Sequence, residues 1–409
     1  MIPLAEARAH VLGRCPRRQP AELALADALG TVLAKPVVAP EDVPPFDNSA
    51  MDGFAVRAAD TAGASADRPV RLSVVATLAA GSALDRPVQT GQAVRIMTGA
   101  PMPPGADSIV MVERTSPAGE HAVAIEVEVG EGLHVRRIGG DIAAGSEVLP
   151  AGTVLGPAHL GVAASVGCRR LTVFPPLRVG VLSTGDELVE GDAPLRPGQI
   201  RESNRPMLLA LVRRAGCRPV DLGLVADDED VLIDVLRTGA AGCDVLVSSG
   251  GVSMGDFDVV KAVLDRIADM SWMQIAIKPS KPFAFGMVDG TPVFGLPGNP
   301  VSSLVSFELL ARPALRQMMG HRRLDRPRLT GRAGADLRRG PDGRVHYVRV
   351  QARWNGDRVQ ATPVNGQGSH QLAATASANA LAVLPDGDGV VFGDAVDLIL
   401  LDDLVTDEI

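Results

Sequence analysis

The chain has 409 residues, too many for one compact core, so its length predicts several domains. A formal net charge of −8 and an aromatic content of 3% argue against nucleic acid or a membrane surface as a general partner, because polyanions repel an acidic protein and few rings can stack on bases. No apolar run approaches the roughly 20 residues of a membrane span, the first residues do not resemble a signal peptide, and four scattered cysteines form no disulfide framework. We therefore expect a cytoplasmic protein.

The first 45 residues predict a small helical part. Apolar residues at helical spacing indicate a helix over Leu4–Leu12, and Asp27 is a suitable N-cap for a second helix over 27–34. Prolines at 40, 44 and 45 then fix an extended linker, so a domain boundary is expected near residue 45. Residues 141–177, with a helix opened by Pro157, are assigned to the same N-terminal domain as residues 1–45.

Residues 46–140 predict an inserted small β domain. Short runs of alternating apolar and polar residues, separated by Gly and Pro, are typical of antiparallel strands. The expected strands are 70–78, 93–97, 108–112 and 122–129.

Residues 178–326 predict a central α/β domain. Short apolar runs alternate with helical segments of 10 to 15 residues, a pattern typical of a doubly wound, mostly parallel sheet with right-handed crossovers. The expected strands are 178–182, 218–224, 244–248 and 273–277, with a hairpin of 283–287 and 292–296. The expected helices are 203–215, 228–241, 257–268 and 300–319. Residues 327–409 return to short strands and predict a C-terminal β domain, with strands at 345–352, 358–362, 380–384 and 395–401.

Polar loops follow two of the predicted parallel strands. One strand ends in Ser183-Thr184-Gly185-Asp186-Glu187, and another leads into the glycine-rich segment 248–258. Ligands of open α/β sheets bind beyond the carboxyl ends of the strands, where glycines let the backbone approach a phosphate. Acids cluster there as well, and a Mg²⁺ ion that bridges phosphate oxygens needs one or two carboxylates. These acids are Asp186, Glu187, Asp227, Asp228, Asp256 and Asp258.

Two further stretches of the central domain suit an anion. Lys278 and Lys281 flank Pro279, whose fixed φ angle stiffens the spacing of the two positive charges. The turn 295–300 opens a helix, with Ser302 or Ser303 near its positive end.

Six motifs in order resemble the MoeA and gephyrin E-domain family of molybdopterin molybdenumtransferases, over essentially the whole chain. The motifs are FDNSAMDGFA at 46–55, RIMTGAPMP at 95–103, STGDEL at 183–188, SSGGVSMGD at 248–256, KPSKPFAFG at 278–286 and GLPGNPVS at 295–302. The resemblance implies a central domain like those of MogA and MoaB. It also implies that the protein inserts molybdate into adenylylated molybdopterin and releases AMP, in a Mg²⁺-dependent step. A homodimer is implied, with each site shared between subunits, and a transient contact with the pterin adenylyltransferase is possible.

The resemblance also assigns roles to individual positions. The residues implied in catalysis are Asp186, Glu187, Asp228, Asp258, Asp52 and Thr98, the last two supplied by the partner subunit. Those implied in metal binding are Glu187, Asp228 and Asp258. Those implied in binding the pterin substrate are Ser183, Thr184, Gly250, Gly251, Ser253, Gly255, Asp256, Pro297, Gly298 and Asn299. Those implied in molybdate binding are Lys278, Lys281, Ser302, Arg349 and Ser369.

The sequence departs from the family pattern at two places, and three alternatives stay open. Phe54 stands where the family usually has Tyr, and Val345-His346 stands where it usually has Pro-Glu, which weakens the assignment of Arg349. The alternatives are a molybdopterin adenylyltransferase-like activity, a gephyrin-like scaffold, and a paralogue specialised for tungstate. The two additional β modules and the retained acids and lysines favour the molybdenumtransferase.

Overall fold

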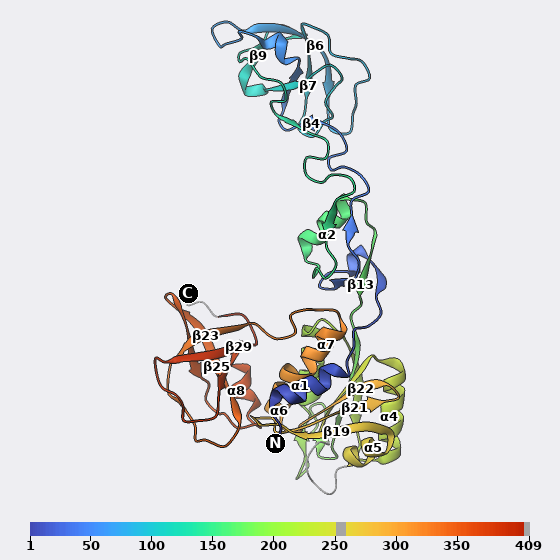
Figure 1. The fold of residues 1–409 in the computed structure, drawn as a ribbon, viewed down its shortest axis with the longest axis vertical. Helices are drawn as coiled ribbons and strands as arrows, with labels where there is room; N and C mark the ends of the chain where they lie inside the picture. Colours follow the sequence, from blue (N-terminus) through green and yellow to red (C-terminus); the bar gives the residue numbers. More distant parts are fainter. Residues whose placement is uncertain (251–258, 405–409) are drawn as a thin grey trace. The chain divides into compact units, whose positions relative to one another are not determined.

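The computed structural model describes residues 1–250 and 259–404, which form two compact units (Figure 1). The larger unit comprises Met1–Glu22, Gly30–Ala34 and Thr172–Ile409. The smaller unit comprises Leu23–Leu29 and Lys35–Leu171. In the part of the chain so described, no helix is both long enough and apolar enough to cross a bilayer.

A six-stranded sheet in the order β17-β14-β18-β22-β21-β19 forms the centre of the larger unit. The first four strands are parallel and the last two continue the sheet antiparallel. In sheet order their bounds are Arg218–Val225, Arg178–Thr184, Val245–Ser249, Thr291–Leu296, Pro282–Val288 and Ala268–Gln274. Strand β18 is buried along its whole length, as expected for a strand covered on both faces. The predicted doubly wound, mostly parallel α/β domain is confirmed.

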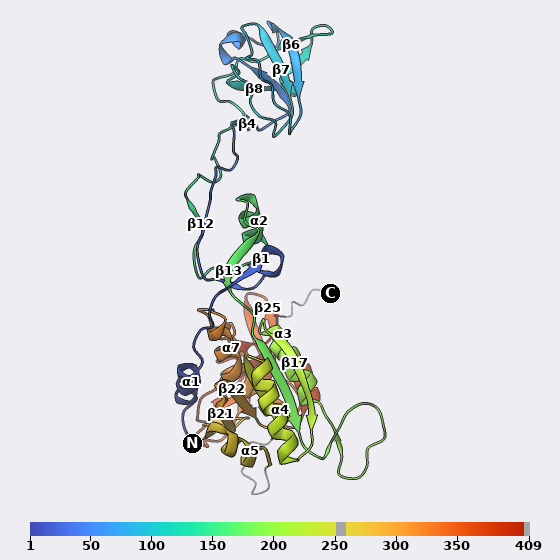
Figure 2. The ribbon, with the colours of Figure 1, turned by 90° about the vertical axis from the view of Figure 1, so that its right-hand side faces the viewer.

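Helices cover both faces of this sheet (Figures 1 and 2). One apolar core includes side chains of α1 (Leu4–Gly13), α3 (Asn204–Arg214), α6 (Pro300–Ser306) and α7 (Arg312–Met318). A second core, on the other face, includes α4 (Glu229–Gly242) and α5 (Val259–Ile267). The N-terminal helix was correctly predicted, and it packs against the central sheet domain through Ala7 and Val11.

Three predicted elements differ in the structure. The second N-terminal helix, 27–34, is wrong, because Gly30 has a φ angle of 77° and the chain then forms the short strand β2 (Val32–Leu33), which pairs with β13 (Arg170–Phe174). The strand expected at 273–277 lies earlier, because Ala268–Gln274 pairs along its whole length with β21. The expected single helix 300–319 contains the π-helical segment η4 (Phe307–Ala311) ahead of Pro313, which lacks the N–H that a regular helix requires there.

The smaller unit contains a six-stranded sheet in the order β8-β5-β7-β6-β10-β9. In that order the strands span Ser108–Met111, Gly53–Val56, Gln92–Ile96, Val70–Leu78, Ala122–Ile125 and Thr115–Pro117. Two apolar clusters pack on this sheet, one around Phe54 and one around Ile96. The small β domain is confirmed, but its sheet is mixed, because β6 and β7 run parallel.

The C-terminal strands of the larger unit form a curved sheet in the order β20-β25-β26-β23-β29-β27, and an additional pairing of β25 with β27 closes it. In that order the strands span Ile277–Lys278, Val345–Asn355, Arg358–Pro363, Arg328–Ala333, Ala395–Leu400 and Ala380–Leu384. The predicted strands are confirmed, and β23 is an addition. Strand β20 belongs in sequence to the central domain, so this pairing joins the lysine segment to the C-terminal domain.

His321 is a buried titratable group at the end of the helical segment that follows β22. Its side chain is 7% exposed, and its Nδ1 atom accepts a hydrogen bond of 3.2 Å from Arg316. Burial first, and then the charges of Arg316 and Arg312, lower the pKa of His321 from 6.5 to about 4. The folded protein therefore holds this imidazole neutral.

The His321 pKa predicts a stability that falls in mild acid. Between pH 6.5 and about 4 the unfolded chain binds a proton at His321 that the folded chain does not, so the free energy of unfolding should fall by about 3 kcal/mol as the pH drops through this window. His321→Gln keeps an acceptor for Arg316 and should flatten the pH dependence, whereas the exposed His121→Gln should not. The urea midpoint, followed by tryptophan fluorescence between pH 4 and 7.5, measures the effect; equal pH dependence in all three proteins would contradict it.

Candidate active site

Three loops meet where the parallel strands β14, β18 and β22 end. Thr184 ends β14, Gly250 follows β18, and Gly298 lies in the turn after β22. A Cβ atom on Gly250, whose φ angle is 99°, would lie 2.9 Å from the Thr184 carbonyl oxygen. On the other side, a Cβ atom on Gly298 would lie 3.9 Å from the Gly250 Cα atom. The structure thus brings together the expected substrate-binding residues Ser183, Thr184, Gly250, Pro297, Gly298 and Asn299 at one sheet edge, with a backbone approach that only glycine permits at position 250.

Five of the expected site residues lie outside the described part of the chain. These are Gly251, Ser253, Gly255, Asp256 and Asp258.

The acidic turns after β14 and β17 lie next to each other. Asp186 Oδ1 accepts a hydrogen bond of 3.1 Å from the backbone N–H of Asp227. Asp228 Oδ1 caps helix α4 by accepting a hydrogen bond of 3.0 Å from Val231 N–H. Asp186, Glu187 and Asp228 are all exposed. Within residues 1–250 and 259–404, no three His, Cys, Asp or Glu side chains lie close enough to hold a metal by themselves. If these acids bind a metal, they would supply one or two carboxylates, and its other ligands would have to come from elsewhere.

A cavity of about 640 Å³ lies between the lysine segment and the C-terminal domain. Lys278, Lys281, Ser302 and Ser369 all line it, so four of the five residues implied in molybdate binding meet there. The backbone N–H of Val301 donates to the Ser369 carbonyl at 3.1 Å, which fixes the loop that carries Ser369 against the start of α6. Between the lysines, Ser280 has a φ angle of 83° and its hydroxyl bonds that of Ser306.

The cavity has more cationic than acidic groups, and the acids are already paired. Arg344 and His346 both contact Asp342, the latter at 3.0 Å between Nε2 and Oδ2. Arg338 pairs with Asp336 at 2.8 Å. The pKa of the Asp342 carboxyl is lowered, chiefly by Arg344 and then by His346, and burial lowers the pKa of His346. Among the described residues Lys278 and Lys281 form no ion pair, so their charges remain available to an anionic ligand.

Arg349, the fifth residue implied in molybdate binding, does not line the cavity. Its side chain is 1% exposed, and burial lowers its pKa. Its guanidinium donates to the carbonyl oxygens of Gly366, Gly368 and Gln371 at 2.9, 3.1 and 3.1 Å, and to the Thr375 hydroxyl at 2.9 Å. All these acceptors belong to the loop and short helix around Ser369. The structure therefore places Arg349 behind the loop that delivers Ser369.

Asp52 and Thr98 meet in the smaller unit, although 46 residues separate them in sequence. Asp52 Oδ1 accepts hydrogen bonds from the Thr98 backbone N–H at 2.6 Å and from the Thr98 hydroxyl at 2.8 Å. These two bonds, the backbone one first, lower the pKa of the Asp52 carboxyl. The pair therefore presents a carboxylate whose negative charge is retained in mild acid.

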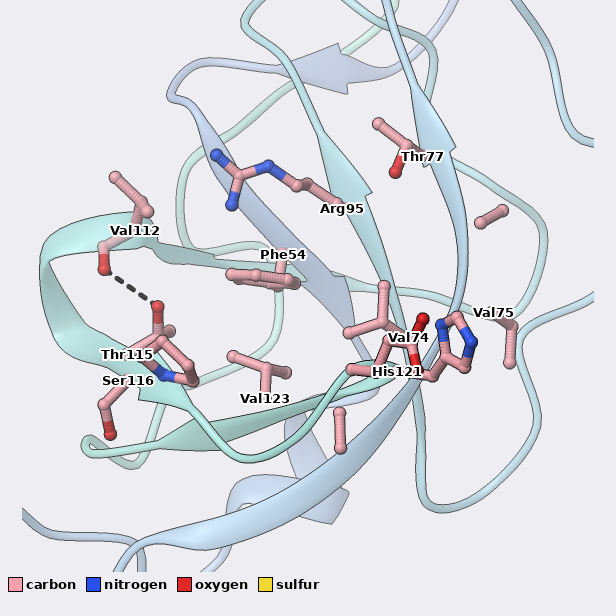
Figure 3. Close-up of a pocket in the computed structure, with 14 residues that line it drawn as sticks. Phe54, Val74, Val75, Thr77, Arg95, Val112, Thr115, Ser116, His121 and Val123 are labelled. Carbon is pink, nitrogen blue, oxygen red and sulfur yellow. Dashed lines mark hydrogen bonds between the residues drawn. The ribbon is translucent and has the colours of Figure 1, made fainter.

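A cavity of about 550 Å³ lies in the same β domain (Figure 3). Phe54, two residues after Asp52, lies in its wall, and the Arg95 guanidinium lies 5.4 Å from the centre of the Phe54 ring. Phe54 is 6% exposed and packs in an apolar cluster. The position at which the resemblance implied a Tyr thus lies in a cavity wall.

The sequence analysis missed several polar residues at these sites. Arg338, Arg339, Asp342, Arg344 and His346 line the larger cavity. Glu202 and Asn204 bind the loops at the strand ends. The unusual Val345-His346 pair was a signal for the first group, and the polar run Glu202-Ser203-Asn204 before an apolar helix was a signal for the second.

Three consecutive stretches of the chain match models of known protein families. Residues 2–167 match the MoeA N-terminal region (domain I and II), residues 180–317 a probable molybdopterin binding domain, and residues 330–401 the MoeA C-terminal region (domain IV). Molybdopterin molybdenumtransferase 2 of Mycobacterium tuberculosis is 43% identical over 90% of this chain and 91% of its own length. The molybdopterin molybdenumtransferase of Haemophilus influenzae is 36% identical over 96% of both chains. A crystal structure of the molybdopterin biosynthesis MoeA protein of Pyrococcus horikosii superposes with a TM-score of 0.82 at 30% identity, over 98% of this chain and 100% of that one.

The Asp52–Thr98 contact predicts a change in one carboxyl pKa. Thr98→Val removes the hydroxyl donor and keeps the backbone N–H, so the pKa of Asp52 should rise toward 3.8 without reaching it. Carboxyl-carbon NMR titration of the wild type and the variant measures this pKa directly. Thr77→Val, in the same domain, should leave it unchanged; an Asp52 titration that does not respond to Thr98→Val would contradict the contact.

Proposed function

The chain belongs to the MoeA family of molybdopterin molybdenumtransferases, and we propose that it inserts molybdate into adenylylated molybdopterin with release of AMP. It is thus a transferase of molybdenum cofactor biosynthesis. The observation that carries the proposal is the cavity lined by Lys278, Lys281, Ser302 and Ser369, whose two lysines form no ion pair with any described residue. Point charges and hydroxyl donors at fixed positions suit a small tetrahedral dianion such as molybdate.

The loops at the ends of β14, β18 and β22 support a neighbouring site for the pterin nucleotide. The three loops approach so closely that Gly250 fits between Thr184 and Gly298, which leaves backbone close to any ligand beyond the sheet edge. Cleavage of the bond between pterin phosphate and AMP builds negative charge on phosphate oxygens, which must be neutralised. Helix α6 begins beside this edge, so its positive end contributes to that neutralisation.

We propose Mg²⁺ as the cofactor, held by Glu187 and Asp228 of the described residues and by Asp258, together with substrate phosphates. The bound ion supplies positive charge at the phosphate oxygens. Asp186 contributes by holding the adjacent acidic turn through its bond with Asp227 N–H, 3.1 Å long. Asp228, through its cap of α4, keeps one carboxylate oxygen in a fixed position and leaves the other for the ion.

The remaining details stay predictions. We propose a homodimer in which Asp52 and Thr98 of one subunit complete the site of the other, a cytoplasmic location, and a transient contact with the pterin adenylyltransferase. The family membership favours the transferase over the adenylyltransferase-like and scaffold alternatives. A preference for tungstate stays an open alternative, because tungstate has the charge and shape of molybdate.

The lysine pair predicts a selective defect in molybdate use. Lys278→Ala and Lys281→Ala should each raise the KM for molybdate at least about tenfold, as expected when a charged hydrogen-bond donor is lost, with little change in affinity for the pterin nucleotide. AMP release from adenylylated molybdopterin is measured against molybdate concentration, with and without Mg²⁺. The matched control is Lys261→Ala. Lys261 lies on α5, and its Nζ atom is 5.7 Å from the centre of the Trp272 ring. Wild-type protein that releases no AMP would refute the proposed function.

The shared site predicts complementation between two inactive chains. Co-expressed Asp52→Ala and Glu187→Ala chains with different tags should give purified heterodimers with one intact site of two, and so about half of wild-type activity. The reciprocal control pairs the wild type with a chain that carries both substitutions; that heterodimer should be inactive, because each of its sites then holds one substituted residue. If the doubly substituted pairing is active and the first is inactive, both residues serve the site of their own chain.

A further inference from the structure

Asn204, the first residue of α3, bridges two of the loops at the sheet edge. Its Nδ2 atom donates to the Ser249 hydroxyl oxygen at 2.7 Å and to the Gly298 carbonyl oxygen at 2.6 Å. The first acceptor ends β18 and the second lies in the turn after β22. Because a carbonyl oxygen can only accept, the amide nitrogen of Asn204 must face Gly298, which fixes the orientation of the side chain.

Asn204 and its partner Ser249 are both buried. The residue is 8% exposed, Ser249 is 2% exposed, and the Asn204 Oδ1 atom is buried without a partner in the described residues. A buried, unpaired acceptor opposes folding, so an apolar residue would suit this position better if packing were its only role. The two N–H bonds are therefore what the asparagine contributes. Since Ser249 accepts from Asn204, its own hydrogen is left to donate elsewhere.

Glu202 connects the same helix start to the third loop. Its Oε1 atom accepts from the backbone N–H groups of Asn204 at 2.8 Å and Arg205 at 3.0 Å, and from the Ser183 hydroxyl at 3.2 Å. The Glu202 side chain is 2% exposed. One buried carboxylate thus caps α3 and holds the end of β14, while Asn204 holds the ends of β18 and β22.

We propose that Asn204 is a positioning residue that sets the separation between the Ser249–Gly250 segment and the Pro297–Asn299 turn, and thereby the shape of the pterin-nucleotide site. The nature of the ligand rests on the proposed function; the tie between the loops does not. The backbone N–H of Gly250 donates to the Leu296 carbonyl oxygen at 3.1 Å, next to the hydrogen bonds of Asn204. The rate at which this N–H exchanges with solvent therefore reports on whether Asn204 holds the two loops together.

Two substitutions separate hydrogen bonding from packing. Asn204→Ala removes both bonds, whereas Asn204→Asp keeps the size and a good helix-starting residue but has no N–H for Gly298. Leu208→Val, a conservative change at a buried position of the same helix, controls for general loosening of α3. Hydrogen–deuterium exchange of segment 245–250 is measured in the free proteins, and KM and kcat with adenylylated molybdopterin in the AMP-release reaction.

Both Asn204 variants should exchange faster in segment 245–250 and show a KM about tenfold higher, with kcat changed less than about threefold, while Leu208→Val behaves like the wild type. Wild-type exchange and KM in Asn204→Asp would overturn the proposal, because packing would then suffice. An equal effect in Leu208→Val would overturn it as well. If the wild type releases no AMP, the proposed function fails, and the exchange measurements alone decide whether Asn204 ties the loops.

Discussion

The parallel alignment of β14, β18 and β22 is the constraint on which the rest of this structure depends. Parallel neighbours end at one edge, so three loops from distant parts of the sequence must share the space beyond it. That space is so small that Gly250 has no room for a Cβ atom beside the Thr184 carbonyl. Crowded backbone, rather than a set of long side chains, therefore defines the candidate nucleotide site. Asn204, the first residue of α3, and Glu202, two residues before it, hold these loops by hydrogen bonds.

The second organising feature is the departure of the chain from the central sheet after β19. Instead of pairing there, Ile277–Lys278 joins β25 of the C-terminal sheet, and the following strand β21 returns to the central sheet. Residues 277–281, which include both lysines, therefore lie between the central and the C-terminal domain. They line a cavity to which both domains contribute residues. The cavity proposed as the anion site thus forms because one short segment takes part in both sheets.

Among the described residues, most of the charged groups that line the larger cavity are paired with one another or with a neighbour. Asp342 pairs with Arg344 and His346. Arg349 donates its hydrogen bonds to carbonyl oxygens of the loop around Ser369. An arginine buried against carbonyl oxygens orders a loop with many polar groups, and the N–H groups that donate to this loop are not available to a ligand. The two lysines are the groups that the described residues leave for an anion. In this arginine-rich cavity the lysines are therefore the candidate groups for binding an anion.

The local sequence determined the element types, because burial patterns and turn residues act over short distances: the alternating strands and helices of 178–296 and the glycine-rich strand ends were predictable. It also supplied motifs that pointed to the lysines, acids and serines at the site. Other features required the tertiary structure. Nothing local predicts that Lys278 pairs with a strand at 346, that Asp52 meets Thr98, or that Arg349 faces carbonyls of its own loop. Pairing between distant strands, and burial that depends on it, decide which charge faces a ligand and which one holds the fold together.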